Sequence, residues 1–248
     1  MSHIPRFEVP GAFHLVEQRV RGGQSALKEF HDRHLSLAMI HGSLYRYGIQ
    51  LGGYNFLSDR VLLVLIPQQP DAIGLALMNA NRSPVRRFNE NHRRDSPFWE
   101  RDYFVCPFAD EVASRVLRYV DMASVRASGG EPLDRHALNS AAEHAGFVTH
   151  GLLTAPPERL PSPVTWPVFV NSPEDETFVK ALELCLRTGR PFGPLPFVRK
   201  VEEACGCRVR PSDLAWPGLF DAARCESRVW HSQGATGAAS ICANQVAH

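Results

Sequence analysis

The sequence has no long hydrophobic run. Among its 248 residues, the longest unbroken apolar stretch covers residues 61–66, far short of the ~18 consecutive apolar residues that a membrane-spanning helix needs. The first five residues also lack the basic start and apolar stretch of a secretory signal. We therefore expect no membrane partner and a cytoplasmic location.

Cysteine is sparse, and its spacing shows no paired framework. The six cysteines are Cys106, Cys185, Cys205, Cys207, Cys225 and Cys242. Without a secretory signal, free thiols in a reducing compartment are the expected state. A single residue separates Cys205 from Cys207, whereas zinc motifs usually have two to four intervening residues. No second cysteine pair accompanies them. The sequence therefore predicts no zinc site.

The net charge is only +1, yet arginine is unevenly distributed along the chain. Two basic segments supply the predicted DNA-binding residues, which are Arg82, Arg86, Arg87, Arg93, Arg94, Trp99, Arg101, Arg190, Arg199 and Lys200. A local basic excess can neutralise phosphates in a neutral protein, and arginine interleaved with aromatic residues suits single strands and hairpin loops. The alternative is a solvated arginine-rich face, with Phe98 and Trp99 filling the core beside a sheet.

The pattern of apolar residues predicts an α+β fold. In chain order we expect a strand at 13–20, a helix at 25–47, strands at 49–57 and 61–66, a helix at 71–91, a strand at 103–106 and a helix at 110–122. The strand at 61–66 is apolar on both faces and should be central. This order is that of a split β-α-β, ferredoxin-like antiparallel sheet with packed helices.

Composition divides the chain into four predicted segments. The first domain covers residues 1–150, and a proline-rich linker covers 151–173. A small basic helical region follows at 174–220, with helices ending near 187 and covering about 194–204. Small aperiodic residues at 221–248 predict a disordered tail.

Several motifs occur in an order that resembles a known protein family. They are PGAF at 10–13, YNFLSDRVLLVLIP at 54–67, RFNENH at 87–92, FWERDY at 98–103, RYVDMASVRA at 118–127, SAAEH at 140–144 and GRPFG at 189–193. Together they resemble the REP-associated tyrosine transposases, a branch of the single-tyrosine HUH transposases. The resemblance covers roughly residues 5–150 and 187–211.

The resemblance implies a metal-assisted attack on DNA. In this family a divalent ion polarises the scissile phosphate, and a tyrosine hydroxyl then attacks to give a phosphotyrosine and a free 3′ hydroxyl. Tyr119 matches the nucleophile. The metal ligands would be two histidines at alternate positions of one strand and a polar residue on the tyrosine helix. Arg60, Leu62 and Ala123 occupy these positions, and none of them can hold a divalent cation.

Other residues in the matching segments offer a rearranged metal site. These candidates are Asp59, His92, Asp102, Asp121 and His144. Arg60 offers a different replacement, a direct contact with the phosphate in place of part of the ion's charge. Tyr119 itself has two interpretations, a residual nucleophile or a core tyrosine whose hydroxyl is bonded locally.

The sequence leaves three functions open. The first is a transposase-like protein that binds single-stranded or hairpin DNA, with metal-dependent cleavage impaired or lost and no cofactor. The second is an active transposase that nicks and joins single-stranded DNA through Tyr119 with Mg²⁺ or Mn²⁺. The third is a degenerate remnant or a non-DNA interaction protein. A homodimer is a further open possibility.

Overall fold

The computed structural model of the protein describes residues 6–21, 27, 30–81, 99–100, 102–128 and 138–206. Several predictions fall on other residues and lie outside this part of the chain. They are the DNA-binding positions Arg82, Arg86, Arg87, Arg93, Arg94 and Arg101, the metal candidate His92, the second half of the helix predicted at 71–91, and the tail at 221–248.

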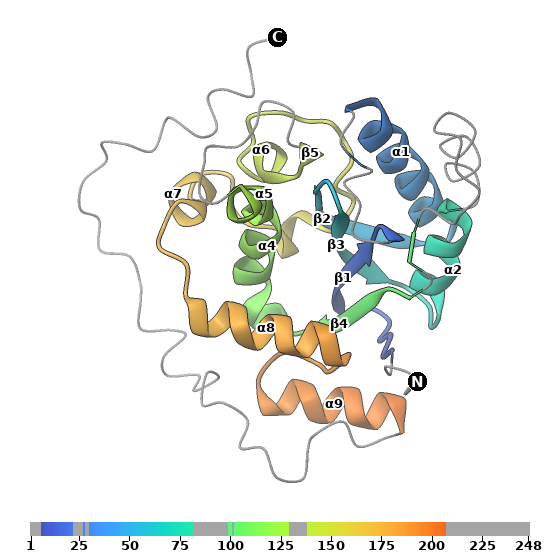
Figure 1. The fold of residues 1–248 in the computed structure, drawn as a ribbon. Helices are drawn as coiled ribbons and strands as arrows, with labels where there is room; N and C mark the ends of the chain where they lie inside the picture. Colours follow the sequence, from blue (N-terminus) through green and yellow to red (C-terminus); the bar gives the residue numbers. More distant parts are fainter. Residues whose placement is uncertain are drawn as a thin grey trace.

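An antiparallel sheet forms the centre of the described residues (Figure 1). Its strands are β1 (Phe13–Arg19), β2 (Ile49–Phe56), β3 (Arg60–Pro67), β4 (Phe104–Phe108) and β5 (Leu138–Asn139). They lie in the order β4-β1-β3-β2-β5, so the doubly apolar β3 is central, as predicted. The first four strands have the ferredoxin-like order, and the predicted α+β fold class is confirmed.

Helices cover both faces of the sheet (Figure 1). They are α1 (Phe30–Arg46), α2 (Ala72–Ala80), α4 (Ala113–Asp121), α5 (Ala123–Ala127), α6 (Ala141–His144), α7 (Trp166–Val170), α8 (Glu176–Thr188) and α9 (Leu195–Cys205). Short 3₁₀ turns are η2 (Asp110–Val112) and η3 (Pro157–Arg159). None of the described helices is both long enough and apolar enough to cross a membrane.

Alternation along β3 separates two hydrophobic cores. Val61, Leu63 and Leu65 pack with residues of α1 and α2. The intervening residues Leu62 and Val64 pack with residues of α4 and α8 on the opposite face. Successive side chains of a strand point to opposite faces, so Arg60 and Leu62 lie on the face that α4 and α8 cover.

The helix predicted at 110–122 is interrupted in the structure. It begins with the 3₁₀ turn η2, α4 ends at Asp121, and α5 begins after Met122. The Asn55 side chain of β2 donates hydrogen bonds to the carbonyls of Val120 at 2.7 Å and Asp121 at 3.2 Å. A side chain that bonds to helical carbonyls competes with the backbone ladder, which accounts for the break after Asp121.

The segment after residue 150 packs on the sheet. Trp166 of α7 is buried within the span predicted as a linker, in the same core as Phe178 and Leu182 of α8. Phe192, in the loop between α8 and α9, donates its N–H to the carbonyl of Pro107 at 2.8 Å. The predicted domain boundaries stay a prediction, but residues on both sides of them share one core.

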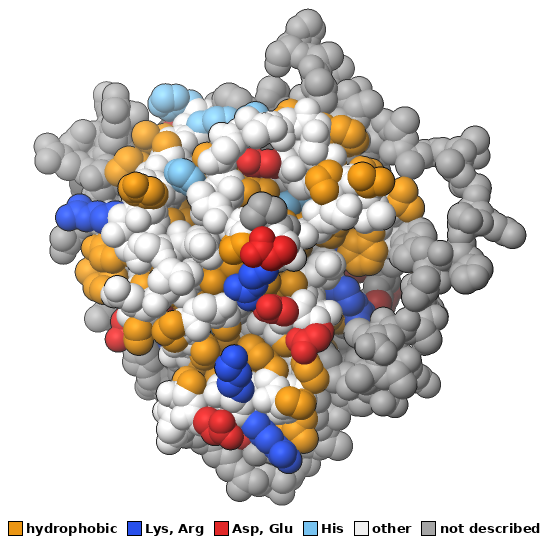
Figure 2. All heavy atoms as spheres, turned by 180° about the vertical axis from the view of Figure 1, so that it is seen from behind, with side chains coloured by type: hydrophobic (Ala, Val, Ile, Leu, Met, Phe, Trp, Pro, Cys, Tyr) orange, Lys and Arg blue, Asp and Glu red, His pale blue; other side chains and the backbone are white. Residues whose placement is uncertain are grey.

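The charged side chains on the far side of the molecule are mixed in sign. In Figure 2, which views it from behind, basic and acidic side chains lie side by side among the described residues. No strongly basic patch is visible on this face of the described part. Most cations among the described residues of this face therefore have an acidic neighbour.

The loop between α8 and α9 provides a test of how the segment after residue 150 packs on the sheet. A Cβ added at Gly193 would lie 2.6 Å from the Cβ of Ala109, so we expect Gly193→Ala to lower the free energy of unfolding by about 1–3 kcal/mol. Gly42→Ala is the matched control, because Gly42 lies in α1 with open space around it. This control should raise stability by about 0.5–1 kcal/mol. Urea unfolding measures both, and equal stabilities would contradict the close contact.

Candidate functional site

Tyr119 lies on α4 beneath α8. Its hydroxyl donates to Glu183 Oε1 at 3.3 Å, and the Arg126 guanidinium covers its ring, with Cζ 4.1 Å from the centroid. The side chain is only 6% exposed. Burial, reinforced by the Glu183 charge, raises the pKa of Tyr119 to about 12. The tyrosine is therefore a neutral, largely buried side chain at neutral pH.

The three expected ligand positions come to the same face as Tyr119. Leu62 and Ala123 are 2% and 5% exposed and belong to the same buried apolar cluster as Tyr119. Arg60 is half-buried at the start of β3. The fold thus brings these positions to the face of the tyrosine and fills two of them with core side chains.

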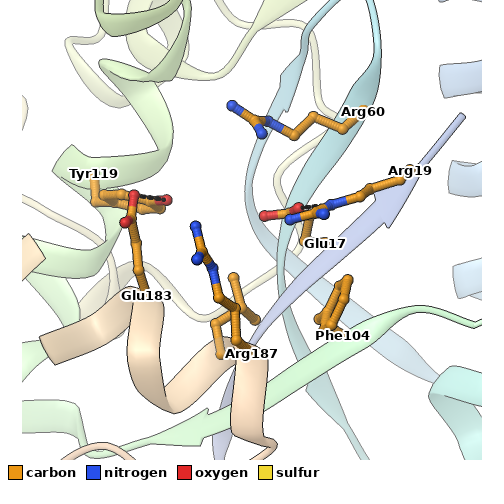
Figure 3. Close-up of a pocket in the computed structure, with 8 residues that line it drawn as sticks. Glu17, Arg19, Arg60, Phe104, Tyr119, Glu183 and Arg187 are labelled. Atoms are coloured by element: carbon orange, nitrogen blue, oxygen red, sulfur yellow. Dashed lines mark hydrogen bonds and ion pairs between the residues drawn. The ribbon is translucent and has the colours of Figure 1, made fainter. Parts of the chain in front are cut away.

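A hollow opens between the sheet and α8 beside the tyrosine (Figure 3). Its lining residues are Glu17 and Arg19 of β1, Arg60 of β3, Phe104 of β4, Tyr119 of α4, and Glu183, Leu186 and Arg187 of α8. Arg60 and Arg187 extend toward the space from opposite sides. Segments distant in sequence therefore supply one charged pocket.

The carboxylates in the pocket are already engaged. Glu17 accepts a hydrogen bond from Arg19 Nε, and the Arg19 guanidinium lies 4.8 Å from the centroid of the Phe104 ring. Glu183 accepts the bond from the Tyr119 hydroxyl. Arg60 forms a long contact outside the pocket, with Nε 3.9 Å from Asp59 Oδ1. The arginines of the pocket outnumber its carboxylates.

The alternative metal candidates Asp121 and His144 form a buried network with each other. The Asp121 carboxylate accepts bonds from His144 Nδ1 at 2.8 Å, the Ser140 hydroxyl at 2.7 Å and Trp166 Nε1 at 3.1 Å. The other His144 ring nitrogen, Nε2, lies 2.8 Å from the carbonyl oxygen of Gly52. Asp121 therefore already has three donors around its carboxylate.

His144 is held as a cation. Both of its ring nitrogens face acceptors, so both carry protons. Burial alone would lower the pKa of His144, but the charge and hydrogen bond of Asp121, together with the Gly52 carbonyl and the Glu143 charge, raise it. The pair therefore ties α4, α6 and β2 together within the core.

The other two described metal candidates, Asp59 and Asp102, lie apart from this network. Asp102 pairs with Arg6 at 2.6 Å, while Asp59 lies beside Arg60 in the β2–β3 turn. Within the described ranges, no three His, Cys, Asp or Glu side chains gather closely enough to hold a metal ion. The described candidates thus occupy separate places in the fold.

The predicted DNA-binding residues occupy different environments. Trp99 is buried in the core that α1 and α2 cover. This is the alternative that the sequence offered for it, a core residue beside the sheet. Arg199 and Lys200 are exposed on α9, and Arg190 is half-buried in the loop after α8. None of these four lines the pocket at Tyr119.

The structure adds pocket residues that sequence reasoning missed. Arg19, Glu17 and Glu183 were not among the predicted site residues. Glu183 and Arg187 are four positions apart and therefore share a face of α8. A glutamate and an arginine four positions apart in the helix predicted to end near 187 are the signal by which they could have been found.

Comparison with known proteins yields structural neighbours only. No family model matches the chain, and no curated protein does. One solved neighbour is a REP-associated tyrosine transposase bound to a REP hairpin, with 11% identity, a TM-score of 0.43, and 53% of this chain and 76% of that chain covered. Another is a "putative transposase" from Deinococcus radiodurans R1, with 18% identity, a TM-score of 0.33, and 48% and 95% covered. These values describe a distant likeness, so residue roles rest on the geometry of this chain.

A second buried histidine is held in the opposite protonation state from His144. His14 Nε2 accepts the N–H of Val9 at 3.0 Å, and its Nδ1 donates to the carbonyl of Ala12 at 2.9 Å. Burial lowers the pKa of His14 to about 4. His14 is therefore neutral in the folded protein at neutral pH.

The two histidines should make the free energy of unfolding pass through a maximum as a function of pH. It falls on the acid side (the acid limb) because of His14 and on the alkaline side (the alkaline limb) because of His144. As the pH falls from the ordinary value of 6.5 to about 4, His14 is protonated first in the unfolded chain, and the free energy of unfolding decreases. His144 stabilises the fold fully below pH 6.5, and this contribution is lost as the pH rises through its raised folded pKa. Urea unfolding measured from about pH 4 to well above pH 6.5 should show the loss of stability on both sides of the maximum.

Asp121→Asn tests the alkaline limb. The variant should lose about 3–5 kcal/mol, because a buried charge loses its partner, and the alkaline limb should disappear while the acid limb remains. Trp166→Phe is the control, because it removes one donor but keeps the Asp121–His144 pair. An NMR titration of His144 gives its pKa directly, and an unchanged alkaline limb in Asp121→Asn would contradict the assignment.

Proposed function

We propose that this protein binds single-stranded or hairpin DNA through its phosphates, and that metal-dependent strand cleavage is lost or impaired. The observation that carries the proposal is the state of the tyrosine site. Leu62 and Ala123 are apolar core residues beside Tyr119, while arginines line the adjoining pocket. The site therefore favours holding a phosphate over activating it with a metal ion.

Charge and exposure support DNA binding. Arg60 and Arg187 extend into the pocket (Figure 3), and Arg199 and Lys200 are exposed on α9. Arginine guanidinium groups match phosphate oxygens in a two-pronged geometry. One structural neighbour is bound to a REP hairpin, which makes hairpin DNA the first ligand to test.

The surroundings of Tyr119 support the loss of cleavage. The hydroxyl is bonded to Glu183 and its ring is covered by Arg126. A nucleophilic tyrosine needs an exposed or readily uncovered oxygen and an activating group. The raised pKa of Tyr119 also disfavours its ionised, more nucleophilic form.

Two other functions remain as outcomes of the tests. Strand cleavage through Tyr119 is favoured by one observation, the position of Tyr119 on the wall of the arginine-lined pocket. A protein that keeps only the fold would bind no hairpin DNA. A homodimer stays a prediction.

Binding to DNA is tested by a salt titration. We expect a hairpin oligonucleotide with a single-stranded tail to bind, with log affinity falling linearly as log salt concentration rises, because phosphate contacts release counterions. Fluorescence anisotropy measures the affinity at each salt concentration. The absence of measurable binding near physiological salt would leave only the non-DNA function.

Cleavage is tested separately by trapping a covalent adduct. Wild-type protein incubated with the same hairpin and Mg²⁺ or Mn²⁺ should yield no protein–DNA adduct on a denaturing gel, since the expected metal positions lack ligands. Tyr119→Phe is the control for any adduct that forms. An adduct present in the wild type and absent in Tyr119→Phe would establish the active transposase in place of the binder.

A further inference from the structure

The pocket beside Tyr119 carries an excess of positive charge. Three arginines and two carboxylates, Glu17 and Glu183, line the hollow. Glu17 is bonded to Arg19, and Glu183 to the Tyr119 hydroxyl. Among the described residues Arg60 has only its long contact with Asp59, at 3.9 Å, so Arg60 and Arg187 are the cations of the pocket that can meet an incoming anion.

These two arginines approach the hollow from different layers of the fold. Arg60 begins β3 in the sheet, and Arg187 lies in the last turn of α8. Figure 3 shows both guanidinium groups directed toward the space between the sheet and the helix. Phe104 and Leu186 supply the small apolar part of a mostly polar lining. Partial enclosure strengthens an ionic contact relative to one fully in water.

We infer that this pocket binds one phosphate group of a DNA strand directly on Arg60 and Arg187, without a metal ion. The inference rests on the proposed function and adds to it the residues that hold the phosphate. Paired guanidinium groups offer several N–H donors in a fixed plane and so satisfy phosphate oxygens without metal coordination.

Glu183 has a defined part in this pocket. Its carboxylate lies on the same helix as Arg187, one turn earlier, and lines the same hollow. A carboxylate beside the phosphate repels it, so Glu183 weakens binding even as it holds the Tyr119 hydroxyl. Removing this charge should therefore strengthen DNA binding, whereas general damage to the fold would weaken it.

The experiment compares four single variants in anisotropy titrations with the tailed hairpin in EDTA. Arg60→Gln and Arg187→Gln should each weaken binding about tenfold, because each loses charged hydrogen bonds to phosphate. Each should also reduce the log–log salt slope by roughly 0.7–0.9. Glu183→Gln should strengthen binding. Arg46→Gln is the matched control, because Arg46 is an exposed arginine at the end of α1, on the other face of the sheet.

Binding should persist in EDTA, and Mg²⁺ should weaken it only as a competing counterion. Binding that disappears in EDTA and returns with Mg²⁺ would overturn the inference. The inference is also overturned if Arg60→Gln and Arg187→Gln bind as tightly as Arg46→Gln. In that case the proposed DNA binding still stands.

If the wild type binds no DNA at all, a separate measurement decides whether the pocket binds an anion. That result would remove the proposed function. Inorganic pyrophosphate is then titrated against the protein while the Nε–H resonances of Arg60 and Arg187 are followed by NMR. Selective shifts at these two arginines in the wild type, with the Arg187 shift reduced in Arg60→Gln, would support the anion pocket, and the absence of shifts at millimolar pyrophosphate would overturn it.

Discussion

The fold around the candidate site depends on the buried carboxylate of Asp121. Ser140, His144 and Trp166 all donate to it, and His144 continues the network to the carbonyl of Gly52 in β2. A buried charge without partners would cost several kcal/mol. The end of α4 is therefore held where α6, α7 and the sheet can satisfy this carboxylate, and that position also sets Tyr119 two residues earlier.

The same helix binds the C-terminal segment through its arginines. Arg115 pairs with Asp175 at 2.8 Å, and Arg126 of the adjoining α5 pairs with Glu174 at 2.8 Å. Arg118 donates to the carbonyl of Val170 at 3.2 Å. These contacts bring α8 over the tyrosine and place Glu183 and Arg187 in the pocket. A region that composition alone separates from the first domain thus completes the candidate site.

The side chains at positions 60 and 62 decide which ligand the pocket can bind. Positions 60 and 62 point to the face of the tyrosine because strand residues alternate. Histidines at such a pair would present two imidazoles to a metal. Arginine and leucine instead present a guanidinium at the rim and a methyl-rich side chain in the core. The rim guanidinium is the group that the proposed phosphate contact uses, while the interior remains apolar.

Local sequence pattern by itself determined much of this protein. The doubly apolar run at 61–66 identified the central strand, and the element order predicted the α+β sheet. Arg60, Leu62 and Ala123 offer no metal-binding atoms at the positions that the resemblance implies. Periodicity and side-chain chemistry are properties of neighbouring residues, so a sequence states them directly. Only the tertiary structure joined Tyr119 to Glu183, 64 residues away, and turned Asp121 and His144 from metal candidates into a buried ion pair. Such partners are decided by how the helices pack on the sheet, and no local spacing records that packing.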